Sequence, residues 1–344
     1  MESLIAADPR NGELIRPYIG GEEVNVSASQ KHHRYIIDFF DRPLRRGDGL
    51  KDWDLMTETE RSECLATGIV PQDFPGEVAE SWPKLLAIVD RLVRPLRLKQ
   101  KRKAHRVRWW QFADKRPGLY QAVSLLDRVL VTNCGASPHL AFAFLPTGIV
   151  YAHTLTVIAF SGTGPFAVLQ SRVHELWARF FSSTLEERLR YTPSDCFRTF
   201  PFPEGFERDA TIQAIGESYY TFRANLMVSR DEGLTNTYNR FHARGEHGAD
   251  IARLRVLHGE MDAAVLRAYG WDDLVARAAP EFIEQEADEG KTPKTRLDWP
   301  SEFKEEVLAH LLALNAERAQ GLVPGSEDEG GEIDDGESEE DDPT

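Results

Sequence analysis

The stretch DRVLVTNCGASPHLAFAFLPTGIVYAHTLTVIAFSGTG (127–164) decides the fold class. Three runs within it, at 127–132, 140–145 and 154–160, are rich in β-branched and aromatic residues and predict strands. Clusters of Gly, Pro, Ser and Thr separate these runs, as turn residues do. A similar run, RYIIDFF (34–40), lies upstream. The pattern predicts a mixed domain in which several strands share a core with helices.

Helical patterns flank the predicted strands. The first covers about 79–109 and the second about 165–182. In the second pattern, large apolar side chains recur at helical spacing and predict a buried face: Phe166, Leu169, Val173, Leu176, Trp177 and Phe180.

The C-terminal part of the chain is almost wholly helical in pattern. Long helices are expected at ATIQAIGESYYTFRANLMVSR (210–230) and IARLRVLHGEMDAAVLRAYG (251–270), with Gly270 closing the second. The polar stretch DEGLTNTYNRFH (231–242) between them predicts a loop. A further helix is expected over 301–319.

Charge and length define the expected domains. The net charge is −15, but residues 326–344 hold eleven acids and no base, so the rest of the chain carries only −4. That end has one aliphatic residue and cannot bury enough surface to fold. We therefore predict an α+β protein with a mixed α/β domain over 1–205, a helical domain over 206–320 and a disordered acidic tail over 321–344.

Several classes of protein are excluded by simple patterns. No apolar run approaches the ~20 residues that a membrane helix needs. The first residues, MESLIAADPRNGEL, lack the charged and apolar regions of a signal peptide. Three widely spaced cysteines show no disulfide or metal-ligand pattern. A cytoplasmic protein with no membrane partner is expected.

The most strongly charged part of the chain is RLVRPLRLKQKRKAHRVRWWQFADKRPGLY (91–120). Between Arg91 and Arg116 it carries eleven Lys or Arg and one acid, with Trp109 and Trp110 set among them. Dense positive charge in an acidic protein favours contact with a nucleic-acid backbone, because each neutralised phosphate releases counterions. A solvated helix face is the alternative, and the two tryptophans are expected to anchor the segment to the core rather than stack on bases.

We predict that six basic side chains in this run contact phosphates: Lys99, Lys101, Arg102, Lys103, Arg106 and Arg108. If they occupy one helix, Arg102 and Arg106 share a face at i, i+4 spacing, and Lys99 lies on the same face three residues before Arg102.

No catalytic or metal-binding constellation is evident. The loop FSGTG (160–164) resembles the glycine loop with which DNA methyltransferases hold S-adenosylmethionine, but no acidic residue follows a second strand, so a tight turn is favoured. The N/D/S-P-P-Y/F/W motif for adenine methylation is absent. Asp298, Glu302 and Lys304 match a nuclease set only by chance, because they lie around a helix start. We predict no catalytic, metal or cofactor residue in this chain.

The order of blocks along the chain resembles the C-terminal part of single-polypeptide restriction-modification enzymes of the MmeI type (type IIL), which are also similar to phage-exclusion methylases. The resemblance covers about residues 9–275. Its blocks are PRNGELIRPYIGGEEVN (9–25), HHRYIIDF (32–39), KQKRKAHRVRWWQFADKRPGLY (99–120), DRVLVT (127–132), HLAFAFLPTG (139–148), VLQSRVHELWARFF (168–181), YTPSDCFRTFPFP (191–203), DEGLTNTYNRFH (231–242) and LRVLHGEMDAAVLRAYGW (254–271).

This resemblance implies a target recognition domain followed by a helical region. It implies that the chain reads a short duplex DNA sequence for an N6-adenine methyltransferase and its nuclease. The nuclease and methyltransferase regions of the family, which would hold S-adenosylmethionine, have no counterpart in this chain. A methyltransferase or nuclease polypeptide is therefore an expected partner beside double-stranded DNA.

Base reading in such a domain would come from polar side chains beside the strands, facing the major groove. The candidates are Thr132, Asn133 and His139, which surround the predicted strand 127–132. Asn can bond adenine N6 and N7 together, but Asn133 before Cys-Gly is also ordinary turn chemistry.

The sequence thus favours a specificity component of a type II restriction-modification system that takes part in phage defence. Whether the chain is itself an enzyme stays open. One alternative is an S-adenosylmethionine-dependent DNA methyltransferase that uses the 160–164 loop, and another is an inactive remnant that folds but binds nothing.

Overall fold

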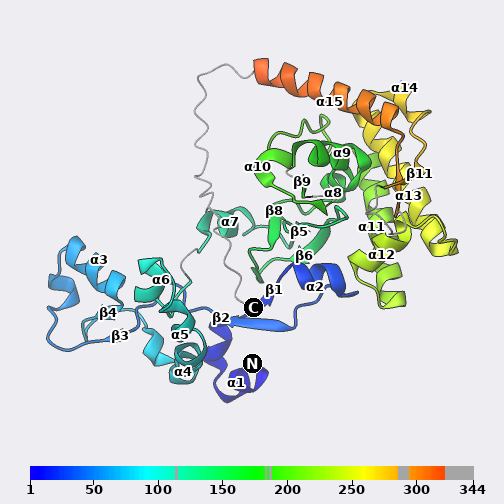
Figure 1. Cartoon of the computed structure of the whole chain (residues 1–344). Coiled ribbons are helices and arrows are strands. Elements are labelled where there is room, and N and C mark those ends of the chain that lie inside the picture. Colours follow the sequence, from blue (N-terminus) through cyan, green and yellow to red (C-terminus); the bar gives the residue numbers. More distant parts are fainter. Residues whose placement is uncertain (113–114, 183, 186–187, 286–293, 322–344) are drawn as a thin grey trace. The chain divides into compact units, whose positions relative to one another are not determined.

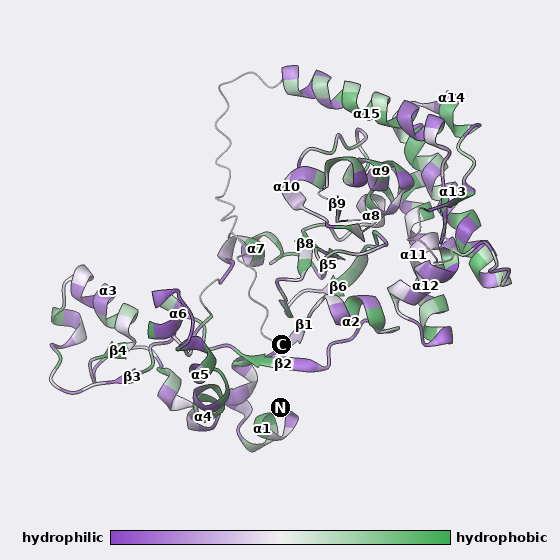
Figure 2. Cartoon of the chain, viewed as in Figure 1, coloured by the Kyte–Doolittle hydropathy of each residue, from purple (hydrophilic) through white to green (hydrophobic). Residues whose placement is uncertain are grey.

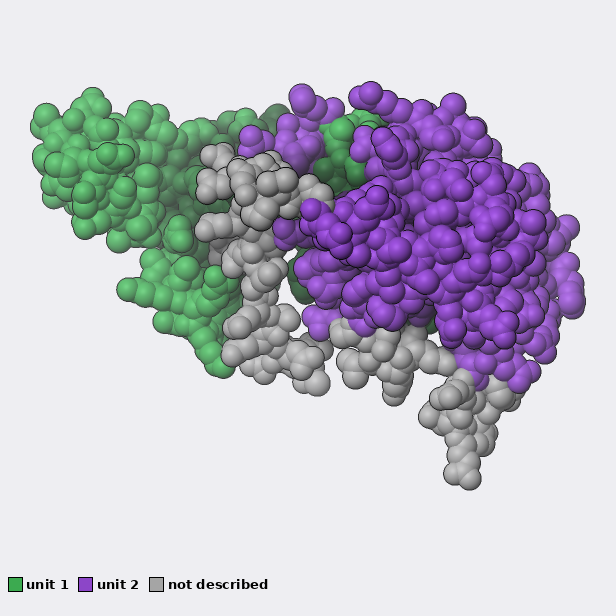
Figure 3. Space-filling model, turned by 90° about the horizontal axis from the view of Figure 1, so that it is seen from above, with its two compact units in different colours: residues 1–117, 126–161, 223–239 green, residues 118–125, 162–222, 240–344 purple. Residues whose placement is uncertain are grey.

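The computed structural model describes residues 1–112, 115–182, 184–185, 188–285 and 294–321. These residues form two compact units that interleave along the chain (Figure 3). The first unit comprises residues 1–117, 126–161 and 223–239, and the second comprises residues 118–125, 162–222 and 240–344.

Short strands and helices build the first unit (Figure 1). Its elements are α1 (Glu2–Ala7), β1 (Ile15–Ile19), α2 (Gly21–Val26), β2 (Arg34–Ile37), β3 (Arg45–Arg46), α3 (Glu58–Thr67), β4 (Ile69–Val70), α4 (Pro83–Leu92), α5 (Arg94–Arg97), α6 (Lys103–Val107), β5 (Arg128–Asn133), β6 (Ala143–Pro146), β7 (Val150–Tyr151) and β8 (Leu155–Ile158).

Two three-stranded sheets organise this unit. In one, β5 lies between β6 and β8 and is antiparallel to both, with Leu130 opposite Phe144 and Ile158. In the other, β1 lies between β2, which is antiparallel, and β7, which is parallel. Strand β2 changes from hydrophilic at its start to hydrophobic at its end (Figure 2).

The predicted strands are present, and their composition explains where they lie. Val129, Leu130 and Val131 of β5 are fully buried, because an uninterrupted apolar run suits a strand covered on both faces. Helix α2 packs against β5. A second core cluster includes Phe39, Trp82 and the two adjacent tryptophans that follow α6. The α+β class expected from the sequence is confirmed.

Helices dominate the second unit. Its elements are α7 (Pro117–Ala122), α8 (Thr163–Gln170), α9 (Arg172–Phe181), β9 (Thr184–Leu185), β10 (Arg188–Leu189), α10 (Pro193–Cys196), α11 (Ala210–Arg230), α12 (Leu234–His242), α13 (Ala249–Ala268), α14 (Asp272–Val275), β11 (Glu281–Glu284), β12 (Thr295–Asp298) and α15 (Ser301–Gly321). Three of these helices, α7, α11 and α12, have residues in both units. Strands β11 and β12 form an antiparallel hairpin.

The helical pattern over 79–109 does not form one continuous helix. The segment is divided into α4, α5 and α6, with non-helical residues between Arg97 and Lys103. Pro95 lacks the N–H that a continuous helix would need there, and the dense like charges around it repel one another at helical spacing. Lys99 and Arg102 therefore lie outside any helix, and the expected shared face with Arg106 does not form.

The helical pattern over 165–182 is also divided, at Ser171. Its side chain accepts a hydrogen bond from the His174 N–H (3.4 Å) and caps α9, while its hydroxyl donates to Val168 O (2.7 Å). Most of the predicted apolar face is buried: Phe166, Leu169, Val173 and Trp177 are fully covered. Phe180 is an exception, with 55% of its surface exposed.

The buried His174 of α9 predicts a pH-dependent stability. Burial lowers its pKa from 6.5 to about 3 in the folded chain, whereas the unfolded chain protonates near 6.5. The unfolded state thus binds more protons between these values, so the stabilisation is complete above pH 6.5 and is lost as the pH falls towards 3. We expect His174→Gln to flatten the dependence of the unfolding free energy on pH by up to about 1.4 kcal/mol per pH unit.

Urea unfolding at pH 5, 6 and 7 measures this slope above the range in which most carboxylates titrate. Glutamine can still reach the hydroxyl of Tyr191, which lies 3.0 Å from His174 Nε2. Parallel pH curves for the parent chain and the variant would contradict the prediction.

The stretch 231–242, expected as a polar loop, contains helix α12. Leu234, Thr237, Tyr238 and Phe241 recur at i, i+3, i+4 and i+7, and all four are buried. This spacing is typical of a helix with one buried face, but the polar residues between these positions made the stretch look like a loop.

The remaining helices agree with the sequence. Helix α11 coincides with the predicted 210–230, and α13 ends just before Gly270, whose φ of +76° is a left-handed conformation that favours glycine. The predicted acidic tail over 321–344 lies outside the described residues, apart from the last residue of α15. No helix in the described part of the chain is long and apolar enough to cross a membrane.

Candidate nucleic-acid interface

The basic segment consists of residues 91–108. It includes the end of α4, all of α5 and α6, and the non-helical residues between these helices. It contains nine Lys or Arg and no acid. Four of the six predicted phosphate-binding residues are exposed: Lys99, Lys101, Arg102 and Lys103. The other two, Arg106 and Arg108, are half-buried. This concentration of accessible positive charge is suited to an extended polyanion.

Two tryptophans hold the end of the basic segment in the core. Trp109 and Trp110 are 8% and 2% exposed, as expected for anchors rather than for rings that stack on bases. Trp110 Nε1 donates a hydrogen bond to Arg42 O (3.0 Å). The ring of Trp110 lies against Gly68, where a Cβ atom would approach it to 2.2 Å and where φ is +80°. A glycine is therefore required for this close packing.

Arg106 stabilises the turn that precedes α6. Its guanidinium donates to the backbone carbonyl of Gln100 (2.6 Å) and to that of Lys101. These carbonyls have no helical partner, because the helix is interrupted at this point. Arg106 thus has a structural role in shaping the turn, whereas Lys99 and Lys103 show no such bond to the backbone among the hydrogen bonds described.

Two of the predicted base-reading residues belong to β5. Thr132 is 2% exposed, and its hydroxyl donates to Ala141 O (3.0 Å), so its side chain is not accessible at the surface. Asn133 is half-buried, and its Oδ1 accepts from the Gly135 N–H (3.0 Å), which is the turn geometry considered from the sequence. The backbone of α2 passes close by, since a Cβ on Gly21 would lie 2.9 Å from Asn133 Oδ1.

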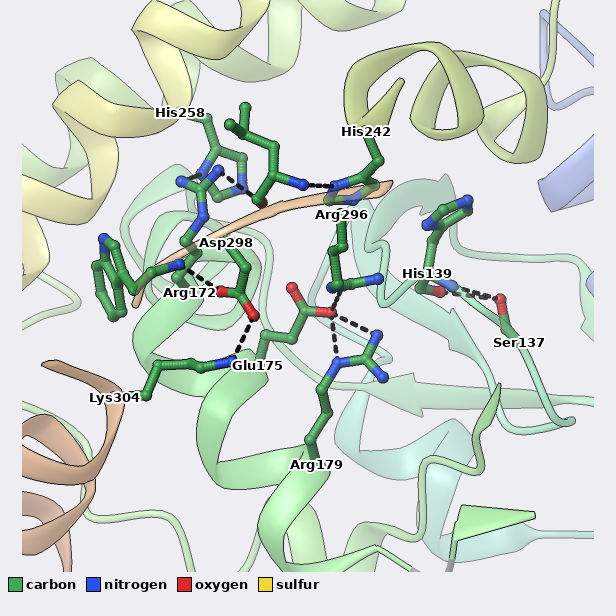
Figure 4. A network of polar contacts seen from close by, with 12 residues as sticks. Ser137, His139, Arg172, Glu175, Arg179, His242, His258, Arg296, Asp298 and Lys304 are labelled. Carbon is green, nitrogen blue, oxygen red and sulfur yellow. Dashed lines mark hydrogen bonds and ion pairs between the residues drawn. The ribbon is translucent and has the colours of Figure 1, made fainter. Parts of the chain in front are cut away.

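The third candidate, His139, lies in the loop between β5 and β6 and has a partner that sequence reasoning missed. Its Nε2 is 2.8 Å from Oδ1 of Asn239 on α12. Its ring centroid is 5.9 Å from that of Tyr238. Ser137 donates its hydroxyl to His139 O (2.9 Å) and fixes the backbone of the loop (Figure 4).

A buried arginine supports this arrangement from α11. Arg223 is 1% exposed and donates to Tyr238 Oη (2.9 Å) and to Phe142 O (2.5 Å). Both the helix that carries Asn239 and the loop that carries His139 are thereby tied to one guanidinium. All these residues belong to the first unit.

The second unit contains a polar network that holds helix α9 and strand β12 together (Figure 4). Glu175 of α9 forms ion pairs with Arg179 and with Arg296 of β12. Burial alone would raise the pKa of Glu175, but the two guanidinium groups outweigh it and lower the pKa to about 2. A cavity of about 210 Å³ adjoins this network.

The chance nuclease match is part of the same region. Lys304 Nζ lies 3.0 Å from Asp298 Oδ2 and neutralises that carboxylate. Within the described residues, no group of three His, Cys, Asp or Glu side chains could hold a metal ion.

Gly164 of the 160–164 loop has a packing reason, and so does Gly216, which packs against the same loop. A Cβ on Gly164 would approach Phe206 O to 2.6 Å, and one on Gly216 would approach Thr163 O to 2.2 Å. The backbone at Phe206, which precedes α11, therefore occupies the space beside Gly164 that an open cofactor loop would leave for a ligand. This favours the tight-turn interpretation of the loop.

Residues 76–204 match the family model "MmeI, target recognition domain", so this part of the chain is similar to the target recognition domains of that family. The resemblance stated from the sequence is confirmed.

A solved structure, that of the type IIL restriction-modification enzyme MmeI in complex with DNA, matches with a TM-score of 0.53 and 16% identity. The match covers 93% of this chain and 33% of that enzyme, so the chain spans about a third of its length. No curated protein matches the chain in sequence.

Proposed function

We propose that this chain binds duplex DNA at a specific short sequence, as the specificity part of a type II restriction-modification system that acts against phage in the cytoplasm. Base methylation and cleavage would be performed by a methyltransferase and nuclease polypeptide, with S-adenosylmethionine bound there. The part over 1–205 would contact DNA, and the helical part over 206–320 would support it.

One observation carries this proposal: the matched region 76–204 contains the whole basic segment and all the base-reading candidates. The basic segment would bind phosphates through Lys99, Lys101, Arg102, Lys103 and Arg108, with Arg106 shaping its turn. Among the base-reading candidates, Asn133 and His139 are half-buried, whereas Thr132 is covered. Phosphate contacts would position the protein, and these side chains would read the sequence.

A fluorescence-anisotropy titration of the full chain with random-sequence duplex DNA, at two salt concentrations, tests the proposal. We expect salt-sensitive binding, because each phosphate contact releases counterions. Selection from a pool of duplexes with randomised positions should then enrich one short sequence. An absence of binding at low salt would contradict the proposal.

Titration with S-adenosylmethionine is the matching control for the rival enzyme. The proposal expects no cofactor binding by this chain, since the 160–164 loop is packed against other backbone. Saturable binding of the cofactor would instead support a methyltransferase.

A further inference from the structure

The pair His139–Asn239 joins two segments that are 100 residues apart in the chain. His139 comes from the β5–β6 loop beside the end of β5, and Asn239 comes from the last part of α12. Asn239 is exposed, while the neighbouring Tyr238 is 3% exposed and anchored by Arg223. An accessible amide is thus held on a rigid, buried support, which is what a base-reading side chain requires.

The hydrogen bond between His139 and Asn239 determines which side chain donates and which accepts. With Oδ1 of Asn239 as the acceptor, His139 carries its proton on Nε2 and donates it. The Nδ2 group of Asn239 can only donate, so it is complementary to hydrogen-bond acceptors. In the major groove, guanine presents two acceptors, O6 and N7, and thymine presents O4.

We propose that Asn239 is a specificity-determining residue, which reads an acceptor-bearing base, guanine first, while His139 fixes the orientation of its amide. This inference rests on the proposed DNA recognition and extends it to α12, a helix that lies beyond the matched region 76–204.

The variant Asn239→Asp tests the idea with almost no change in shape. Aspartate can still accept the His139 proton, but the amide donor is replaced by an acceptor. After selection from a randomised duplex pool, we expect the preference at one base pair to change. Guanine or thymine at that position should be replaced by a base that presents a donor, cytosine or adenine, with a roughly tenfold change in relative affinity.

Asn236→Asp is the matched control, because it adds the same charge to an exposed position of the same helix. It should weaken binding to all sequences alike and leave the selected site unchanged. His139→Ala should relax the preference at the base pair that Asn239→Asp changes. The double variant His139→Ala/Asn239→Ala should relax it no further than Asn239→Ala alone, because His139 acts through Asn239.

The outcomes separate this inference from the proposed function. A parent chain that selects a site, with Asn239→Asp selecting the same site, would overturn the role of Asn239 alone. A parent chain that binds no DNA would overturn the proposed function and this inference together. Thermal unfolding of each variant shows whether a change in preference arises without a loss of folded protein.

Discussion

Replacing Asp262 by alanine should lower the free energy of unfolding by about 3–5 kcal/mol, the largest stability effect that we expect. Asp262 and Arg172 form an ion pair of 2.6 Å between α13 and α9, with side chains only 1% and 4% exposed. Burial alone would raise the pKa of Asp262, but the neighbouring His258 and Arg172 and their hydrogen bonds hold it below its usual value. Removing the carboxylate leaves a buried guanidinium without its counter-charge.

The second contribution of Asp262 is to the end of a helix. Its Oδ1 accepts from the backbone N–H of Arg172 (2.8 Å), one of the N–H groups at the start of α9 that have no partner within the helix. Asp262→Asn keeps this acceptor but removes the charge. Its free energy of unfolding should therefore lie between that of the parent chain and that of the alanine variant. Urea unfolding measures all three.

The double variant Arg172→Met/Asp262→Leu distinguishes the cause of the loss. If an uncompensated charge dominates, removing both charges should recover a large part of the stability. The loss of unfolding free energy in the double variant could instead equal the sum of the losses in Arg172→Met and Asp262→Leu. That result would show that packing and the bond from Arg172 to Leu297 O (3.3 Å) matter more than the charge.

Changing Lys101, Arg102 and Lys103 together to alanine should weaken binding to every DNA sequence by about 10- to 1000-fold at moderate salt. These exposed side chains lie where the basic segment turns into α6. If each of them contacts one phosphate, the slope of log affinity against log salt should fall by about 2.7, since each contact contributes about 0.9. Anisotropy titrations over a range of salt concentrations give both quantities.

The control removes the same number of charges from exposed positions of the second unit that lie outside the matched region 76–204: Arg208, Arg253 and Arg267. This variant should retain most of its affinity and its salt slope. Equal losses in the two triple variants would mean that binding follows net charge rather than the basic segment. The sequence selected by the basic-segment variant should stay the same, because phosphate contacts carry no base information.

Local patterns in the sequence were sufficient to predict most of the individual strands and helices. The apolar run of β5 and the long periodic stretches of α11 and α13 each encode their own conformation within a few residues. The charge of the basic segment and the anchoring of Trp109 and Trp110 could also be predicted. Residue type and spacing are enough for these features, because they depend on hydrophobic burial and Coulomb repulsion between near neighbours.

Breaks and polar helices were harder to predict. Pro95 and Ser171 interrupt patterns that are otherwise helical, and the capping bond of Ser171 competes with the periodicity around it. Helix α12 has its buried residues at regular spacing, but polar side chains separate them and its stability comes from packing.

The candidate site depends on contacts that no local pattern contains. Thr132 and His139 are both polar residues near the end of one predicted strand, yet the first is covered and the second is only half-buried. The partner of His139 is Asn239, on a helix far away in sequence, and the buried guanidinium of Arg223 supports both. The amino-acid order thus dictates which residues form strands, helices and a cationic surface, since these follow from short-range forces. Folding alone determines which side chains meet and which remain exposed, because long-range packing is what brings distant segments together and removes others from water.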